Sequence, residues 1–213
     1  MIVVNCLAAC GPTVVRVNPV FEFPTPLVEP LPLKMGVFYP EEFRNFVYDE
    51  SKDTQGVDDT SIELGSAQVS LLDRIFLSYF EQVQVLEPGE SASVRSGLDA
   101  VLVPQVVDVE YSVPRTSNAK IYEVWIKYQF NLLEPNGTII ATWTMPTYGK
   151  TPTAMLKSNK EAINLASMMA LRDCGAAFIT GFHKVPEVAQ WLDSSIGNAA
   201  GENQFKREEI SNE

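Results

Sequence analysis

The sequence is poor in the side chains on which many enzymes and metal sites depend. It holds one histidine, His183, so a serine–histidine–aspartate triad or a histidine-rich metal site would have to use that residue. His183 follows a predicted helix, and a favourable interaction with the helix end is the simpler explanation for it. The three cysteines, Cys6, Cys10 and Cys174, form no C-x-x-C pair, which argues against a zinc site and a disulfide framework. We therefore expect neither a metal nor catalysis.

Positive charge and long apolar runs are also scarce. Sixteen Lys and Arg residues oppose 27 Asp and Glu residues, and the resulting net charge of −11 repels nucleic-acid phosphates and anionic membrane surfaces. No run of about 18 apolar residues is present that could cross a bilayer. A length of 213 residues suits one folded domain with tails. We expect no nucleic-acid partner, and any contact with a membrane requires a covalent or hydrophobic anchor.

The beginning of the chain contains its one specific motif. An apolar start leads into Leu7-Ala8-Ala9-Cys10, in which small residues precede a cysteine as they do at secretory cleavage sites. This segment resembles the lipobox of bacterial lipoprotein precursors. The resemblance implies that residues 1–9 are the remnant of a signal peptide and that Cys10 carries a covalent lipid, with no other cofactor. The alternative is a buried first strand that contains the same four residues.

The segment after Cys10 is rich in proline. Six prolines lie between Gly11 and Pro32, without helical periodicity, so we expect residues 10–32 to form an extended, lipidated tether. By resemblance to lipoprotein sorting, Gly11 after the cysteine implies the outer membrane, with the body on its periplasmic side. At the other end, residues 193–213 are polar and predicted to be disordered.

Residues 33–192 are predicted to form a single domain. The first half contains apolar alternation typical of strands and one apolar stripe typical of a helix. An acidic loop interrupts it, whose spacing does not match a calcium-binding EF-hand. The predicted elements are a strand over Leu33–Tyr39, the loop Asp49–Ser61, a helix over Leu64–Phe80 with Ser61 as a possible N-cap, and a short strand through Val83 and Val85 that ends at Pro88.

The second half gives the clearest local patterns. Asn136-Gly137 is a preferred tight-turn pair, and the alternation on both sides of it predicts a hairpin in which Phe130 and Trp143 share the core face. Ser158 and Glu161 form a capping box that begins a long helix. The predicted elements are a strand over Leu98–Tyr111 that is at an edge or bulged at Pro104, the hairpin Ile121–Thr147 with Ile139 on its core face, a helix from Ser158 to Gly181 with Met169 on its apolar face, and a short helix from Pro186 to Leu192.

This order of elements predicts an α+β fold, with a mostly antiparallel sheet of four to five strands and two main helices packed on one face. The lipobox and the element order together resemble the small α+β lipoproteins of Gram-negative envelopes, such as the lipopolysaccharide-assembly lipoprotein and the auxiliary lipoproteins of ABC transporters. The resemblance implies a role as a non-catalytic scaffold or accessory subunit of an envelope assembly or transport machine. Its partners would be the bilayer, through the lipid, and a protein of the envelope.

Three groups of residues are candidates for binding or chemistry. Glu123, Trp125 and Lys127 lie on the exposed face of the hairpin and could contact a partner, because exposed tryptophan is enriched at binding hot spots. Tyr128, Trp143, Met169 and Phe178 could line an apolar cleft between sheet and helices, which gives the alternative function of binding a lipid-like ligand. Asp108 and Glu110 share a strand face about 7 Å apart, as glycosidase carboxylates do, and suggest a hydrolase as a third alternative.

Overall fold

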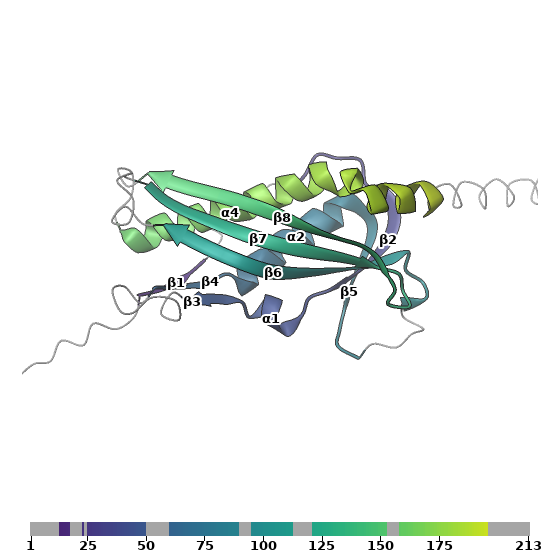
Figure 1. The fold of residues 1–213 in the computed structure, drawn as a ribbon, viewed down its shortest axis with the longest axis horizontal. Helices are drawn as coiled ribbons and strands as arrows, with labels where there is room; N and C mark the ends of the chain where they lie inside the picture. Colours follow the sequence, from purple (N-terminus) through teal and green to yellow (C-terminus); the bar gives the residue numbers. More distant parts are fainter. Residues whose placement is uncertain are drawn as a thin grey trace, which may run out of the picture.

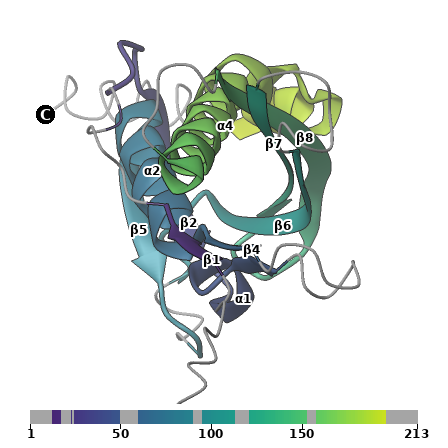
Figure 2. The same cartoon turned by 90° about the vertical axis from the view of Figure 1, so that its left-hand side faces the viewer.

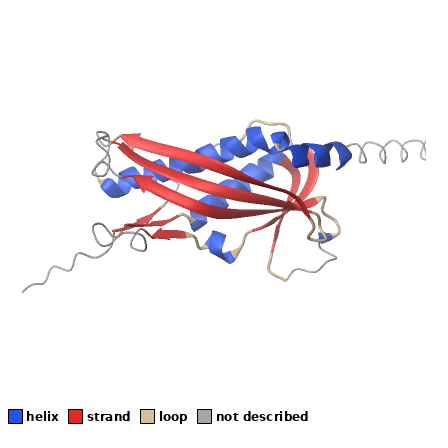
Figure 3. Cartoon of the chain, viewed as in Figure 1, coloured by secondary structure: helices blue, strands red, loops and turns tan. Residues whose placement is uncertain are grey.

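The computed structural model describes residues 13–17, 23, 25–49, 60–89, 95–112, 121–152 and 158–195. They form two sheets and a layer of helices (Figures 1 and 3). In chain order the elements are β1 Thr13–Arg16, β2 Leu31–Phe38, α1 Glu41–Arg44, β3 Val47–Asp49, β4 Thr60–Glu63, α2 Gly65–Tyr79, β5 Phe80–Leu86, β6 Ala100–Ser112, β7 Ile121–Leu133, β8 Ile139–Pro152, α4 Asn159–Gly181 and the 3₁₀ turn η3 Phe182–Lys184. Residues 186–195 are also helical.

The larger sheet is mixed, so the prediction of a mostly antiparallel sheet is wrong. Its strand order is β5-β2-β6-β7-β8. β2 runs parallel to both of its neighbours, β5 and β6, whereas β6, β7 and β8 pair antiparallel. The reason lies in the connection, because the chain between β2 and β5 passes through α1, β3 and β4 and returns through α2. A helical crossover returns the chain in the same direction, as in a βαβ unit.

A second sheet, with strand order β1-β4-β3, was not predicted. β1 pairs parallel with β4, and Val15 and Val17 are fully buried. This strand lies within the predicted tether, so residues 13–16 belong to the folded body. Ser61 pairs within β4 and does not cap a helix, since α2 begins four residues later at Gly65. Most of the predicted acidic loop, residues 50–59, lies outside the described residues.

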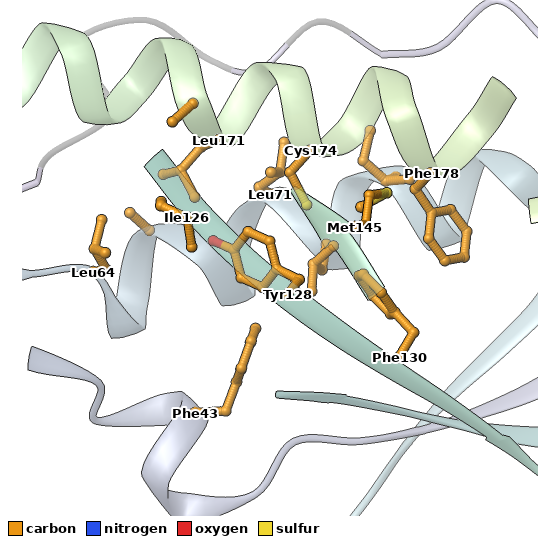
Figure 4. Close-up of a cluster of buried hydrophobic side chains, with 14 of the residues drawn as sticks. Phe43, Leu64, Leu71, Ile126, Tyr128, Phe130, Met145, Leu171, Cys174 and Phe178 are labelled. Carbon is orange, nitrogen blue, oxygen red and sulfur yellow. The ribbon is translucent and has the colours of Figure 1, made fainter. Parts of the chain in front are cut away.

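The prediction of two helices on one face of the sheet is confirmed. The five-stranded sheet curves, and α2 and α4 lie within the curve (Figure 2). The core forms between them, where Tyr128 and Phe130 of β7 approach Leu71 of α2 and Phe178 of α4 (Figure 4). Cys174 of α4 is buried in the same cluster, as expected of a small apolar side chain. Burial of aromatic side chains supplies much of the stability of such a core.

The hairpin of β7 and β8 has the predicted register. Phe130 lies opposite Trp143, and their ring centroids are 5.5 Å apart. Gly137 adopts a φ of 95°, which L side chains rarely adopt, and this explains the Asn-Gly pair at the turn. The pairing is irregular next to Leu133, and Ile139 is therefore exposed rather than on the core face.

Helix α4 packs across β8 and β7 along its alanine-rich face. Ser158 caps it, since its hydroxyl accepts a hydrogen bond of 3.2 Å from the backbone N–H of Glu161. Met168 is buried and Met169 is 40% exposed, so the prediction that Met169 faces the core is wrong. Residues 159–184 are long and apolar enough to cross a membrane by length and composition, but 56% of that window is buried inside the fold, as in a core helix.

The last described helix extends past the predicted domain boundary at residue 192. Residues 193–195 belong to the last described helix instead of to a disordered tail. Residues 196–213 lie outside the described residues.

Candidate functional site

The outward face of β6, β7 and β8 carries a pocket of about 310 Å³, which we call the outer pocket. It brings together two of the predicted groups, the carboxylates of β6 and the tryptophan and lysine of β7. The residues that line it are Asp108, Glu110, Trp125, Ile126, Lys127, Pro146 and Thr147. The volume is at the lower end of the range of about 300–1,000 Å³ typical of small-molecule sites.

A bulge in β6 turns the two carboxylates outward. Val106 lies opposite Tyr128 of β7, but the next paired residue is Asp108, opposite Lys127. The extra residue, Val107, is 51% exposed. Side chains alternate between the two faces of the sheet along a strand. After this single extra residue, the residues of β6 therefore point to the face opposite to the one they would otherwise occupy. Without it, Asp108 and Glu110 would point toward the core.

The position of the bulge bears on the prediction for Pro104, which was expected to be at an edge or bulged. Pro104 is regularly paired with Phe130, and the irregularity comes later, at Val107. Pro104 is nevertheless at an edge, as predicted, because the pairing of β2 with β6 ends at Leu102. Val107 does not share the inward face of Val109, which is 7% exposed.

Trp125 packs against an aromatic neighbour on β8. It lies opposite Tyr148, and the two ring centroids are 5.1 Å apart. The Tyr148 hydroxyl donates a 2.5 Å hydrogen bond to Oε1 of Glu123. This hydrogen bond and the burial and charge around it raise the pKa of Tyr148. Glu123 therefore orients Tyr148, against which Trp125 packs, and Trp125 remains 37% exposed.

The predicted apolar cleft between sheet and helices is filled by side chains where its residues lie. Tyr128 and Phe178 are fully buried, and Phe178 contacts the ring of Trp143 with centroids 6.4 Å apart. Phe130 packs between them, 5.2 Å from Phe178. Met169 points away from this cluster and is exposed. The four residues that were predicted to line the cleft therefore do not surround a common cavity.

A smaller apolar pocket lies between α2 and α4, below the segment around Phe23. Its volume is about 180 Å³, smaller than the range typical of small-molecule sites. Arg74 fixes the covering segment, since its Nη1 donates a 2.7 Å hydrogen bond to the carbonyl of Phe23. The lining residues are Phe23, Thr25, Pro26, Leu71, Ile75, Arg172, Gly175, Ala176 and Ile179.

The remaining candidates are distributed elsewhere. Cys10 and the predicted signal remnant, residues 1–9, lie outside the described residues. His183 lies in η3 and is exposed next to Lys184. Within the part of the chain that the structure describes, no three His, Cys, Asp or Glu side chains are grouped in a way that could hold a metal ion.

Sequence reasoning missed two residues of the outer face, Pro146 and Tyr148 of β8. The hairpin turn at Asn136-Gly137 fixes which residues lie opposite each other, so it could have placed Tyr148 beside Trp125. The pairing of Asp108 with Lys127 across β6 and β7 could not be predicted from the sequence in this way. It depends on the bulge at Val107, which no turn residue or proline marks in the sequence.

Comparisons with known proteins show the fold and nothing finer. No family model matches the chain, and no curated protein sequence matches it. Among solved structures, the chain is similar to protein XCC0632 from Xanthomonas campestris, of the family DUF330, at 13% identity and a TM-score of 0.50, over 86% of this chain and 96% of that one. This likeness shows a shared fold.

Two other similar structures are lipoproteins by name. One is the minor lipoprotein of Acinetobacter baumannii, with 9% identity, a TM-score of 0.42 and coverage of 71% of this chain and 91% of that one. The other is the uncharacterised lipoprotein B of Nitrosomonas europaea, with 13% identity, a TM-score of 0.39 and coverage of 72% and 89%. These two likenesses are too distant to carry an argument. The resemblance to lipopolysaccharide-assembly and ABC-transporter lipoproteins stays a prediction.

Proposed function

We propose that this protein is a non-catalytic lipoprotein of the bacterial envelope, held to the outer membrane by a lipid on Cys10. The observation that carries the proposal is the position of the lipobox relative to the fold. Cys10 precedes β1, which begins at Thr13, by three residues, and three residues span at most about 10 Å. The anchor would therefore hold the sheet of β1, β4 and β3 next to the lipid headgroups.

Charge gives an independent reason for a covalent anchor. A body with a net charge of −11 is repelled by an anionic membrane surface, so its own electrostatics do not keep it there. Stable attachment of such a body needs more than one acyl chain. A diacylglycerol group on Cys10, as the lipobox implies, provides that number.

We propose the absence of catalysis because the two candidate catalytic carboxylates, Asp108 and Glu110, are exposed. Asp108 and Glu110 are both exposed on the outward face of β6. The general acid of a glycosidase depends on an apolar, partly dry environment that keeps it protonated at neutral pH. The surroundings of these two carboxylates are open to water. We therefore favour an accessory or scaffold role in an envelope machine over a hydrolase.

The anchor is tested by metabolic labelling with radioactive palmitate in a Gram-negative host, with Cys10→Ala as the test variant. Cys6→Ala is the matched control, because Cys6 lies four residues earlier and outside the lipobox. We expect label in the natural chain and in Cys6→Ala, no label in Cys10→Ala, and the labelled protein in the outer-membrane fraction of a density gradient. Absence of label, or equal label in Cys10→Ala, would overturn the proposal.

A further inference from the structure

The outer pocket combines an aromatic side chain with hydrogen-bonding groups. Trp125 forms part of the lining, and its ring packs against Tyr148, whose hydroxyl donates to Glu123. A side chain that already packs against a neighbour loses less conformational freedom when a ligand binds than a free one does. The pocket therefore offers a preformed surface for a flat, partly apolar ligand.

The polar groups of the pocket are suited to hydroxyl groups. Asp108 and Glu110 accept hydrogen bonds on one side, and Lys127 donates from the adjacent strand, opposite Asp108. Hydrogen bonds from a neutral hydroxyl to a charged group are stronger than those between neutral groups. A ligand that has an apolar C–H face and several hydroxyls at its edges matches both parts of the pocket. A pyranose ring has this shape and chemistry.

Charge narrows the class of ligand. The lining holds two carboxylates and one ammonium group, and the whole chain carries a net charge of −11. This field disfavours phosphorylated or acidic ligands and is compatible with neutral or amino-substituted ones. We propose that the outer pocket binds a saccharide of neutral or amino-sugar type, without cleaving it. The proposal does not depend on the lipid anchor.

The binding test uses the folded chain and three defined trisaccharides, of glucose, of N-acetylglucosamine and of glucosamine, with sialyllactose as an acidic probe. Ligand-observed NMR and calorimetric titration at millimolar concentration measure the affinities. We expect at least one of the three trisaccharides to bind and sialyllactose not to bind. Trp125→Ala should weaken binding by about tenfold or more, as loss of a central aromatic contact does. Asp108→Asn and Glu110→Gln should each weaken it several-fold.

Two control variants show whether a loss of saccharide binding comes from the outer pocket or from any change of a tryptophan or carboxylate. Trp191→Phe changes a tryptophan on the last described helix, and Asp193→Asn removes an exposed carboxylate of the same helix. Both should bind as the natural chain does. No binding of any of the three trisaccharides, or equal binding by Trp125→Ala, would overturn the proposal.

Three further results would assign the face differently. A dimer in sedimentation experiments that Trp125→Ala dissociates would show that a second copy covers the outer pocket. Binding of a basic peptide, but of none of the saccharides, would show a cation-binding surface. Release of free sugar that Glu110→Gln abolishes would show hydrolysis and overturn the non-catalytic part of the proposal.

Discussion

At Gly149 the backbone of β8 comes close to the backbone of α4. A Cβ atom at this position would lie 2.0 Å from the carbonyl oxygen of Ala166 and 2.4 Å from the backbone nitrogen of Ala170. Both contacts are with helix backbone, which cannot move aside as a side chain could. We expect Gly149→Ala to displace α4 and to lower the free energy of unfolding by about 1–3 kcal/mol, the usual cost of overpacking a core. Urea denaturation measures this change.

Gly181 provides the matched control for that substitution. It ends α4, and a Cβ atom there meets no atom within 4 Å. Alanine has the higher helix propensity, so Gly181→Ala should leave the free energy of unfolding unchanged or raise it by up to about 1 kcal/mol. A Gly149→Ala protein as stable as Gly181→Ala would contradict the close packing of β8 on α4.

A buried hydrogen-bond chain links three elements. The Tyr128 hydroxyl donates to Oε1 of Gln68 at 3.2 Å, and Nε2 of Gln68 donates to the carbonyl of Phe43 at 2.6 Å. Tyr128 and Gln68 are both fully buried. We expect Tyr128→Phe to cost about 1–3 kcal/mol of unfolding free energy, because it leaves a buried amide oxygen without a donor.

Thermodynamic coupling tests whether the two side chains act through this hydrogen bond. In a double-mutant cycle with Gln68→Leu, the Tyr128→Phe change should cost less than it does in the natural chain, because the unpaired amide oxygen is already gone. Additive losses in denaturant unfolding would show that the hydroxyl and the amide do not interact.

At the level of elements, β1 and the buried residues that follow it show whether this segment is a free tether or part of the folded body. Val15, Val17 and Phe23 are buried, and Val17 donates its backbone N–H to the carbonyl of Glu63. A chain that starts at residue 33 loses these three side chains, worth about 1.5–3 kcal/mol each, from a total stability of about 5–15 kcal/mol. We expect that truncation to be unfolded or aggregated, and a chain that starts at residue 11 to be folded, as judged by circular dichroism. Equal stability of both would restore the tether interpretation.

The elements that sequence reasoning found are those with local signals. Capping by Ser158, the turn at Asn136-Gly137 and the apolar stripe of α2 each predict structure from neighbouring residues, and all three are confirmed. β1 was missed because a four-residue strand with few inward side chains gives little periodicity. Its pairing with β4 joins residues 47 positions apart, which no local pattern reports.

The difference between local signals and long-range strand pairing also explains what could be predicted of the candidate site. Trp125 and Lys127 were recognised because they face outward on a regular hairpin strand. The outer pocket was not predicted, because it needs the register of β6 against β7 in addition. That register shifts at Val107, and the shift is a property of the assembled sheet.

At the scale of the whole molecule, the two ends have different surroundings in the proposed arrangement. β1, β3 and β4 lie at one end of the fold, and the β7–β8 turn and the end of α4 lie at the other (Figure 1). A lipid on Cys10 would hold the first end at the bilayer. The turn around Asn136 would then point away from the membrane, and the outer pocket would lie along the side.

The buried cysteine thiol and tyrosine hydroxyls of the core make the free energy of unfolding depend on pH in the alkaline range. Burial raises the pKa of the Cys174 thiol, and the carboxylate of Asp173 raises it further. Burial is also the main cause of the raised pKa of Tyr128 and Tyr39. In the unfolded chain these groups lose their protons near their ordinary pKa values, about 8.5 for cysteine and 10 for tyrosine. The folded state keeps them protonated to higher pH.

The sign of the effect follows from this proton balance. Above pH 8.5 the folded state binds more protons than the unfolded state, so the free energy of unfolding should fall as pH rises, by up to about 1.4 kcal/mol per pH unit for each group. Below pH 8.5 these groups contribute a constant amount. Urea denaturation from pH 7 to 11 measures the curve, and Cys174→Ala should delay the fall until the tyrosines respond near pH 10. A natural chain with constant stability from pH 8.5 to 10, or a Cys174→Ala variant with the same onset, would contradict the burial of an ionisable thiol on α4.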